Sequence, residues 1–414
     1  MADVSRYPRS LQRFRLVALI VLFVITPLAQ VAVTRIVPAG IGVSLLILLA
    51  GHLIHGGRYF EWAALKRLIT FAEWKEETRW LGWLISAFLG WSMITLLWSP
   101  QPLPGFLDII AVGAVIPLAA LLIIEFSSLA RQHIRLALIV GLSAAALLLI
   151  LEINGATQVH LLDDDVLWLY HLNRCAVLLA ILVWTVPLTT PADGPWRWLT
   201  IIPFFFVALA LVYTQSQAAQ LAFLGAALTG LILSLLPMLR LAAYSAIAVA
   251  MLAVPFSLPV LEDLTRSLPG VVQADGHTEH RLVIWKAYSE TIKTRPVVGG
   301  GMRADRVIGK DELAERSDIT RFNEPPTHPH NFILEIWTNL GLIGAALAAA
   351  IIGTVGLITG TMARRHARLT TQVFGAAFVY ASTGASAVQV WWLAIIVLVF
   401  TVFGLTRGSN QMEQ

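Results

Sequence analysis

The sequence contains little charge and almost no cysteine. Only 13% of its 414 residues are charged, whereas 57% are hydrophobic. A soluble domain of this composition would expose far more apolar surface than water tolerates, so the soluble classes are excluded. The single cysteine, Cys175, excludes a disulfide within the chain, and the compartment therefore does not follow from cysteine pairing.

Two further patterns are absent. No Walker sequence with its lysine and its serine or threonine occurs, so nucleotide-driven chemistry has no support. The glycine triplet at 299–301 is expected to form a turn and is by itself a weak sign of phosphate binding. No repeat recurs at a fixed period, which argues against a solenoid.

Long apolar runs are what the sequence does contain. A helix needs roughly 20 mostly apolar residues to cross a bilayer. Runs near this length occur at about residues 16–34, 36–55, 80–98, 106–126, 136–153, 171–188, 196–213, 217–236, 240–257, 332–358, 370–387 and 389–406. The predicted fold is therefore an all-α polytopic membrane protein with about twelve transmembrane helices.

Lysine and arginine residues fall in alternate loops. If the N-terminus is cytoplasmic, the loops on that side collect most of the bases, whereas the opposite short loops hold only Arg35. Both termini are then predicted to lie in the cytoplasm, and the protein is predicted to span a bacterial inner membrane. The predicted organisation is nine helices in 1–257, a periplasmic loop domain in 258–331, and three helices with a cytoplasmic tail in 332–414. The net charge of +4 then reflects topology and gives no sign of nucleic-acid binding.

The long hydrophilic segment ends in the polar motif His328-Pro329-His330-Asn331. Because Pro329 biases the preceding residue away from helix, the next helix is expected to start near His330 or Asn331, with Asn331 as N-cap and Glu335 in its first turn. The helix dipole would disfavour an imidazolium at His330 and favour the neutral ring that a general base needs. The alternative is that both histidines are interfacial loop residues that water or the backbone satisfies.

A shared metal at the two histidines would require a third ligand. Glu324 or His277 would have to converge on them, and we predict no metal site.

Cationic residues of the same segment are further candidates. The spacing of Arg281, Trp285 and the apolar residues around them predicts an amphipathic helix over 277–294, which Pro296 ends. Other bases, including Arg303, form a solvated face, or a subset of them holds a diphosphate through forked arginine contacts.

Two polar features lie at the outer ends of predicted spans. Arg174 is either functional or a partner for the aspartates at 163–165, because an arginine at a membrane boundary is costly without such a role. The uncharged turn at 213–217 either lines a cavity or caps helix ends.

Three blocks in this order resemble a known superfamily. They are Thr214-Gln215-Ser216-Gln217, Arg281 with Trp285, and His330-Asn331 followed by Leu334, Gly341 and Gly344. They are similar to the Thr-x-Ser-Arg turn, the Arg-x-x-x-Trp block and the His-Asn signature of the superfamily of O-antigen ligases, O-antigen polymerases and O-linked oligosaccharyltransferases. The resemblance extends over the order of spans and the place of the long loop. One departure is Gln217, where the family usually has arginine; Arg174 or a loop arginine could supply the missing charge, or Gln217 hydrogen-bonds only.

The resemblance implies transfer of a glycan from undecaprenyl diphosphate to an acceptor at the periplasmic face. It implies His330 as the base and Arg281 as the cation that stabilises the leaving diphosphate. Further substrate contacts are expected from Arg174, Gln217, His328, Asn331, Arg303 and Glu335. Because the donor is already activated, direct inverting displacement needs no ATP, metal or other cofactor; a covalent route would need a carboxylate such as Glu335. The fold is expected to be similar to that of other polyprenyl-dependent, GT-C-like membrane glycosyltransferases.

The acceptor distinguishes the members of this superfamily. We predict a ligase, which joins O-antigen to lipid A-core, because the long loop lies late in the chain beside the His-Asn motif. The close alternatives are the O-antigen polymerase and the protein O-oligosaccharyltransferase. A transporter or flippase, the alternative from another class, would be expected to show repeated halves with broken helices, and neither is evident in the sequence.

Overall fold

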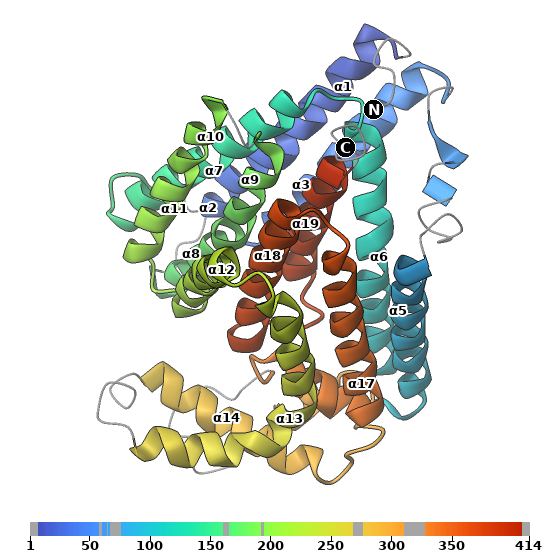
Figure 1. Ribbon diagram of the computed structural model, residues 1–414, viewed down its shortest axis with the longest axis vertical. Helices are drawn as coiled ribbons and strands as arrows, with labels where there is room; N and C mark the ends of the chain where they lie inside the picture. Colours follow the sequence, from blue (N-terminus) through green and yellow to red (C-terminus); the bar gives the residue numbers. More distant parts are fainter. Residues whose placement is uncertain are drawn as a thin grey trace.

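The computed structural model describes residues 7–57, 60–63, 65–66, 76–159, 165–191, 194–267, 276–309 and 328–407. This part of the chain is helical and contains no strand (Figure 1). In chain order the helices are α1 (Arg9–Ile20), η2 (Val21–Ile25), α2 (Thr26–Ala32), α3 (Ile36–Ile54), α5 (Glu76–Thr95), η3 (Leu96–Trp98), α6 (Pro102–Phe126), α7 (Arg131–Ile153), α8 (Asp165–Leu182), η4 (Val183–Thr185), α9 (Val186–Thr189), α10 (Trp196–Leu199), α11 (Ile201–Tyr213), α12 (Gln217–Leu235), α13 (Leu239–Ser267), α14 (Gly276–Ile292), α15 (Ala304–Val307), α17 (Phe332–Gly360), α18 (Arg364–Thr383) and α19 (Val390–Arg407).

Ten helical segments of the described residues are long and apolar enough to cross a membrane. They are Arg9–Ala32, Ile36–Ile54, Thr78–Trp98, Pro102–Phe126, Arg131–Ile153, Leu172–Thr189, Trp196–Tyr213, Gln217–Leu235, Leu239–Leu258 and Phe332–Gly360. Each corresponds to a predicted span. The other two predictions fall on α18 and on the shorter apolar helix Val390–Thr406. The predicted class, an all-α polytopic membrane protein, is confirmed.

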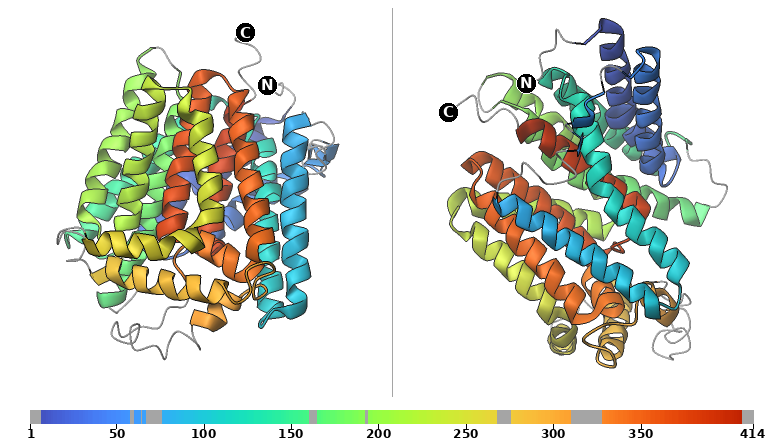
Figure 2. Two further views of the ribbon diagram at one scale, coloured as in Figure 1. Left: turned by 60° about the horizontal axis from the view of Figure 1, so that its bottom comes forward. Right: turned by 90° about the vertical axis from the view of Figure 1, so that its right-hand side faces the viewer.

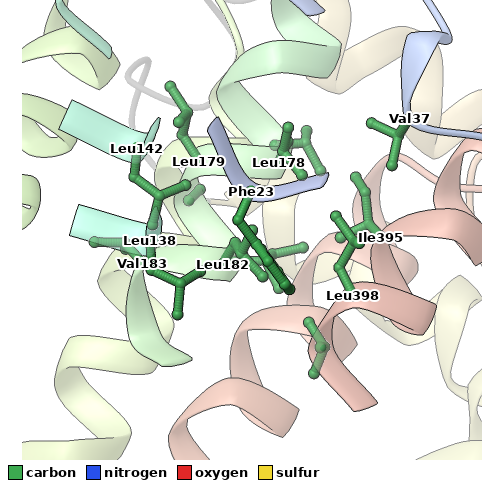
Figure 3. Close-up of a cluster of buried hydrophobic side chains, with 14 of the residues drawn as sticks. Phe23, Val37, Leu138, Leu142, Leu178, Leu179, Leu182, Val183, Ile395 and Leu398 are labelled. Atoms are coloured by element: carbon green, nitrogen blue, oxygen red, sulfur yellow. The ribbon is translucent and has the colours of Figure 1, made fainter. Parts of the chain in front are cut away.

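The largest hydrophobic core joins the first helices of the chain to the last one. Figure 3 shows Phe23 of η2 packed among Leu138 of α7, Leu182 of α8 and Leu398 of α19. All four side chains are fully buried. Segments far apart in sequence therefore share one core, and their packing fixes the positions of the helix ends.

Helix α8 is the central helix of this bundle. In the span Leu172–Thr189, which begins within α8, 83% of the residues are buried, compared with 17% in the span Thr78–Trp98. A helix that faces protein on most sides can carry polar residues at low cost, because they do not meet lipid. This burial explains how α8 accommodates Asn173 and Arg174 in a membrane-spanning segment.

Helix α14 and the C-terminal part of α13 lie across one end of the bundle. Figure 1 and the left view of Figure 2 show them at the end opposite the start of α1 and the end of α19. Buried Ile284, Tyr288 and Ile292 form the inner face of α14, as the predicted amphipathic helix requires. Helix α13 continues to Ser267, so the boundary proposed at residue 257 falls inside a helix.

Helix α17 is broken at Gly341, whose backbone has φ 64° and ψ −161°. A break leaves helical carbonyl and N–H groups without their usual partners. Here the segment 296–301 pairs with them, through the bonds Gly300 N–H to Thr338 O at 2.8 Å, Gly301 N–H to Asn339 O at 3.0 Å, Leu342 N–H to Pro296 O at 2.8 Å and Ile343 N–H to Val297 O at 3.3 Å. A Cβ atom at Gly341 would lie 2.4 Å from the carbonyl oxygen of Val297, so only glycine fits.

This pairing adds to one prediction and corrects another. The glycine triplet completes the backbone hydrogen bonding of a membrane helix, a structural use that its sequence did not suggest. The expectation that broken helices are absent is wrong for α17. One broken helix does not by itself indicate a transporter, because the break is occupied by the chain's own loop.

Candidate active site

His330 directly precedes the N-cap of α17 and has a left-handed backbone, with φ 51°. The Asn331 side-chain oxygen accepts the N–H of Ile333 at 2.9 Å and that of Leu334 at 3.3 Å. The predicted N-cap at Asn331 is therefore confirmed. A non-glycine residue keeps a left-handed conformation only where neighbouring contacts impose it, and such residues are frequent at functional sites.

Trp285 connects α14 to the histidine loop. Its indole N–H donates to the carbonyl of Pro329 at 2.8 Å. Arg281 lies one turn earlier on the same face of α14, and its guanidinium is within electrostatic range of the His330 ring. The two residues of the Arg-x-x-x-Trp block thus have separate tasks, because Trp285 fixes the helix against the loop and Arg281 brings charge to the histidine.

The two imidazole rings lie against each other. Their centroids are 3.9 Å apart, and the ring planes differ by 42°. Burial, followed by the charge of Arg281, lowers the pKa of His330 to about 4. Burial, followed by the neighbouring His330, lowers the pKa of His328 to about 2. Both rings are therefore neutral near pH 7, and the leading cause is burial, in place of the helix dipole that the sequence suggested.

The backbone of Gly384, in the turn after α18, orients the His330 ring. The hydrogen bond between them raises the pKa of His330, so it stabilises the protonated ring. The ring N–H therefore donates to the Gly384 carbonyl, and the other ring nitrogen keeps its lone pair. A Cβ atom at Gly384 would lie 3.2 Å from Cβ of Ala218, so the first turn of α12 meets this turn.

Several guanidinium groups gather at this end. Arg174 donates to the Thr34 hydroxyl at 2.5 Å and lies 5.6 Å from the centre of the Trp391 ring. Arg174 and Arg281 are both within electrostatic range of the Tyr380 hydroxyl. Arg306 is within electrostatic range of both histidines, and its charge lowers the pKa of each. Asp163 and Asp164, and the side chain of Asp165, lie outside the described residues, so the alternative role for Arg174 is not tested.

Glu335 lies beneath the histidines and is only 1% exposed. One carboxylate oxygen accepts the Ser386 hydroxyl and the other accepts the Ala387 N–H, both at 2.8 Å. Arg306 donates to the same Ser386 hydroxyl at 2.8 Å and pairs with Asp305 at 3.3 Å. Burial raises the pKa of Asp305. Glu335 therefore fixes the turn that carries Gly384, and through it the orientation of His330.

Two residues that were predicted to contact substrate, Arg303 and Gln217, are not shown beside the histidines. Arg303 forms a bidentate ion pair with Asp108, with N–O distances of 2.6 and 2.9 Å. Gln217 is exposed at the start of α12, in the same turn as Ser216, its N-cap. In that turn the Thr214 hydroxyl donates to the carbonyl of Leu211 at 3.0 Å, which is the predicted capping role.

Sequence reasoning missed part of this site. It did not single out Arg306 and did not identify Tyr380, Gly384 or Ser386. The last two apolar runs, 370–387 and 389–406, are so closely spaced that a tight turn must join them, and that turn was the available signal. Nothing in the sequence indicated that it would lie against His330, because this contact joins α17 to the α18–α19 connection.

The part of the chain that the structure describes holds no cluster of three histidine, cysteine, aspartate or glutamate side chains suited to a metal. Glu324 and the side chain of His277, the possible third ligands, lie outside that part. The absence of a metal site stays a prediction.

The fold and this site define a class: a polytopic helical membrane protein with a half-buried neutral histidine at an arginine-rich end of its bundle. Within that class, residues 202–349 match the profile of the family described as O-Antigen ligase. The matched region contains all three sequence blocks, from the turn at 214–217 to Gly344. The resemblance stated from those blocks is confirmed.

Curated relatives from Rickettsia carry names that class them provisionally as polysaccharide ligases. The chain is 26% identical over 230 residues to the protein of Rickettsia conorii, which is 54% of each chain. It is 24% identical over 272 residues to that of Rickettsia typhi and 26% identical over 278 residues to that of Rickettsia prowazekii, in each case 64% of this chain and 65% of the relative. The chain thus spans between about half and two thirds of the length of these relatives.

Proposed function

We propose that this protein transfers a polysaccharide from undecaprenyl diphosphate to a sugar hydroxyl of lipid A-core, at the periplasmic face of the bacterial inner membrane. The observation that carries the proposal is the half-buried neutral ring of His330, oriented by Gly384 and placed beside Arg281. The match to the O-antigen ligase profile and the names of the Rickettsia relatives support the same class of reaction.

The reaction is a single displacement at the anomeric carbon. The free nitrogen of His330 takes the proton of the acceptor hydroxyl, and the acceptor oxygen attacks the anomeric carbon. The bond from that carbon to the diphosphate oxygen breaks, and undecaprenyl diphosphate leaves with the electron pair. Attack opposite the leaving group inverts the anomeric centre. The diphosphate is the activating group, so the step needs no ATP.

Donor binding increases the basicity of His330. A histidine with a pKa of about 4 is a weak base in the empty protein. A diphosphate beside Arg281 offsets the positive charge that helps to depress this pKa, so the ring becomes more basic when donor is present. Arg281 then stabilises the charge that develops on the leaving diphosphate.

The remaining residues bind or position the substrates. Arg174 and Arg306 add positive charge for the diphosphate, and Arg174 compensates for Gln217. His328 packs on His330, and Asn331 fixes the start of α17. Arg303 acts through Asp108, away from the reacting atoms. Direct displacement is favoured over a glycosyl-enzyme because Glu335 is buried with both oxygens already hydrogen-bonded.

The orientation of the protein in the membrane is part of this proposal. The asymmetry of basic loops supports cytoplasmic termini and a periplasmic α14. Reporter fusions after Gly276 and after Ala363 are expected in opposite compartments. The same compartment for both fusions would contradict the topology.

Lipopolysaccharide gels of a deletion strain test the choice of acceptor. Loss of a ligase leaves lipid-linked polymer but removes the ladder on core. Loss of a polymerase leaves core with one repeat, and loss of a protein oligosaccharyltransferase leaves the gel unchanged. Purified protein with lipid-linked donor and core acceptor is expected to remain active in EDTA without ATP. Activity that requires a divalent ion would overturn the metal-independent displacement.

A further inference from the structure

Tyr380 lies near the C-terminal end of α18 and is only 6% exposed. Its ring packs against the rings of Trp392 and Trp391, with centroids 5.1 and 6.1 Å apart. A Cβ atom at Gly384 would lie 2.9 Å from Cε2 of the tyrosine ring, so the ring lies against the turn whose backbone orients His330. These contacts fix the tyrosine beside the reaction centre.

The hydroxyl of this tyrosine is not explained by packing. It makes no hydrogen bond to any residue that the structure describes. The Ser382 hydroxyl, two residues further along the chain, is completely enclosed without a partner, whereas the Tyr380 hydroxyl is not enclosed in this way. It therefore opens onto space that the described residues do not fill. A buried tyrosine O–H usually has a hydrogen-bond partner, and a phenylalanine would pack against the two tryptophans equally well.

Two guanidinium groups from other helices lie around this hydroxyl. Arg174 of α8 and Arg281 of α14 are both within electrostatic range of it. Trp391 connects the first of them to the tyrosine, because the guanidinium carbon of Arg174 lies 5.6 Å from the centre of that ring. Among the described residues Arg174 pairs with no carboxylate and donates to the Thr34 hydroxyl. Other N–H groups of its guanidinium are thus available to a ligand.

The hydrogen-bonding capacity of these groups selects the chemistry of the ligand. A guanidinium group carries only donors, so neither arginine can accept the hydrogen of the tyrosine O–H. An anion with several oxygen atoms can accept from both guanidinium groups and from the phenol at the same time. A diphosphate is such an anion, and its oxygen atoms form strong, charge-assisted hydrogen bonds.

We propose that the Tyr380 hydroxyl donates a hydrogen bond to a diphosphate oxygen of the lipid-linked donor, between the contacts of Arg174 and Arg281. The proposal rests on the function proposed above and adds a neutral donor to that site. The hydrogen bond strengthens as negative charge develops on the leaving diphosphate, so Tyr380 contributes to turnover as well as to binding. The diphosphate leaves as an anion, so the phenol keeps its proton.

Tyr380→Phe removes the hydroxyl and keeps the ring. We expect its affinity for undecaprenyl diphosphate, measured on purified protein in nanodiscs, to fall by about tenfold, because a hydrogen bond to a charged group is lost. The single-turnover rate should fall by roughly 10- to 100-fold. Undecaprenol, which has the same tail without phosphate, is the control ligand and should bind wild type and variant alike. Unchanged affinity for the diphosphate with an unchanged rate would overturn the proposal.

A phosphate on the acceptor lipid is the other source of the same chemistry. Lipid A-core offered without donor distinguishes the two sources, because its affinity should be equal for wild type and Tyr380→Phe. A loss of affinity for lipid A-core, with unchanged affinity for undecaprenyl diphosphate, would assign the hydroxyl to the acceptor and overturn the proposal.

A matched variant separates a ligand role from a structural one. Tyr244→Phe removes the hydroxyl of another buried tyrosine, which donates to the Thr371 hydroxyl at 3.5 Å, and it should keep the wild-type affinity and rate. Tyr380→Phe should keep the wild-type unfolding temperature, because its hydroxyl has no partner to lose among the described residues. A fall in that temperature with unchanged affinity and rate would show that Tyr380 is only structural.

The binding and transfer measurements distinguish this proposal from the proposed function. If wild-type protein transfers polysaccharide and Tyr380→Phe equals it in affinity and rate, the role of Tyr380 fails alone. If Tyr380→Phe weakens the binding of undecaprenyl diphosphate but wild-type protein transfers no polysaccharide to lipid A-core, the proposed function fails alone.

Discussion

Buried charges occur at both ends of the helical bundle, and the two sets are arranged differently. Near the start of α1, Arg15 donates to Glu125 at 3.0 Å and to Ser128 at 2.7 Å. His52 approaches the other oxygen of Glu125 at 2.8 Å. Arg15 and Glu125 are 1% and 3% exposed. This cluster joins α1, α3 and α6 and pairs the charges of Arg15 and Glu125 without a ligand.

At the opposite end, several arginines gather near the two histidines. Arg281 and Arg306 lie within electrostatic range of the histidine pair, and Arg174 and Arg281 lie within range of the Tyr380 hydroxyl. A paired buried ion holds helices together, whereas clustered guanidinium groups gain from an anion such as a diphosphate. This difference in arrangement separates a structural cluster from a candidate binding site within one fold.

The largest effect on activity is expected from His330→Ala. Loss of a general base lowers the rate by about 10²- to 10⁴-fold. Donor affinity should be largely unchanged, because the arginines hold the diphosphate. Single-turnover rates and donor affinities of purified variants measure both quantities. If His328→Ala is inactive and His330→Ala is active, the choice of histidine is wrong.

An effect of similar size, but on stability and not on activity, is expected at the end that holds Arg15 and Glu125. Glu125→Ala leaves the buried charge of Arg15 unpaired and should cost about 3–5 kcal/mol of stability. Turnover per folded molecule should stay close to that of wild type. Denaturation of the detergent-solubilised protein measures the cost, and Arg15→Met in the same chain should recover part of it. A specific loss of turnover in folded Glu125→Ala would remove the distinction between the two ends.

A smaller effect is expected from Glu335→Gln, which tests positioning. An amide can accept only one of the two bonds that Ser386 and Ala387 donate, and one mismatched buried group costs about 1–3 kcal/mol. We expect a lower turnover rate with little change in KM, because the mutation acts on His330 through Gly384. Glu335→Asp, which keeps the charge but shortens the reach, is the matched control. A glycosyl-enzyme that can be trapped in wild type and is lost in an inactive Glu335→Gln variant would instead indicate covalent chemistry at Glu335.

The pH profile tests how Arg281 acts on the histidine. Because the pKa of His330 is lowered to about 4, its neutral form persists as the pH falls well below the ordinary histidine value. The kcat/KM ratio of wild type should therefore change by less than about twofold between pH 7.5 and 5.5 from this group, whereas an ordinary histidine would lose about tenfold. Arg281→Met should weaken donor binding and move the acid limb to higher pH. An unmoved limb would show that Arg281 does not affect the histidine.

The smallest effect is expected from Gln217→Arg, which introduces the residue usual in the family. An exposed charge contributes about 0.2–1 kcal/mol, so donor affinity should rise by no more than about fivefold. Arg174→Met in both backgrounds tests compensation, since the gain from Gln217→Arg should be larger when Arg174 is absent. Equal gains in both backgrounds would show that the two positions act independently.

Local patterns in the sequence were sufficient for the helices and their ends. The lengths of the apolar runs predicted ten spans that the structure contains. The position of Asn331 before the last long loop's helix predicted the N-cap of α17. The spacing of the apolar residues also predicted helix α14, in which Trp285 lies one turn after Arg281. These features depend on residues close together in sequence, where helix geometry alone relates one side chain to the next.

Only the tertiary structure decided which distant groups meet. Glycines 300 and 301 close the break in α17, Glu335 holds the turn of Gly384, and Asp108 takes Arg303. Each contact joins helices separated by tens of residues or more, so no local periodicity encodes it. The neutrality of His330 was expected from a helix terminus but arises mainly from burial, which depends on the packing of the whole bundle around the ring.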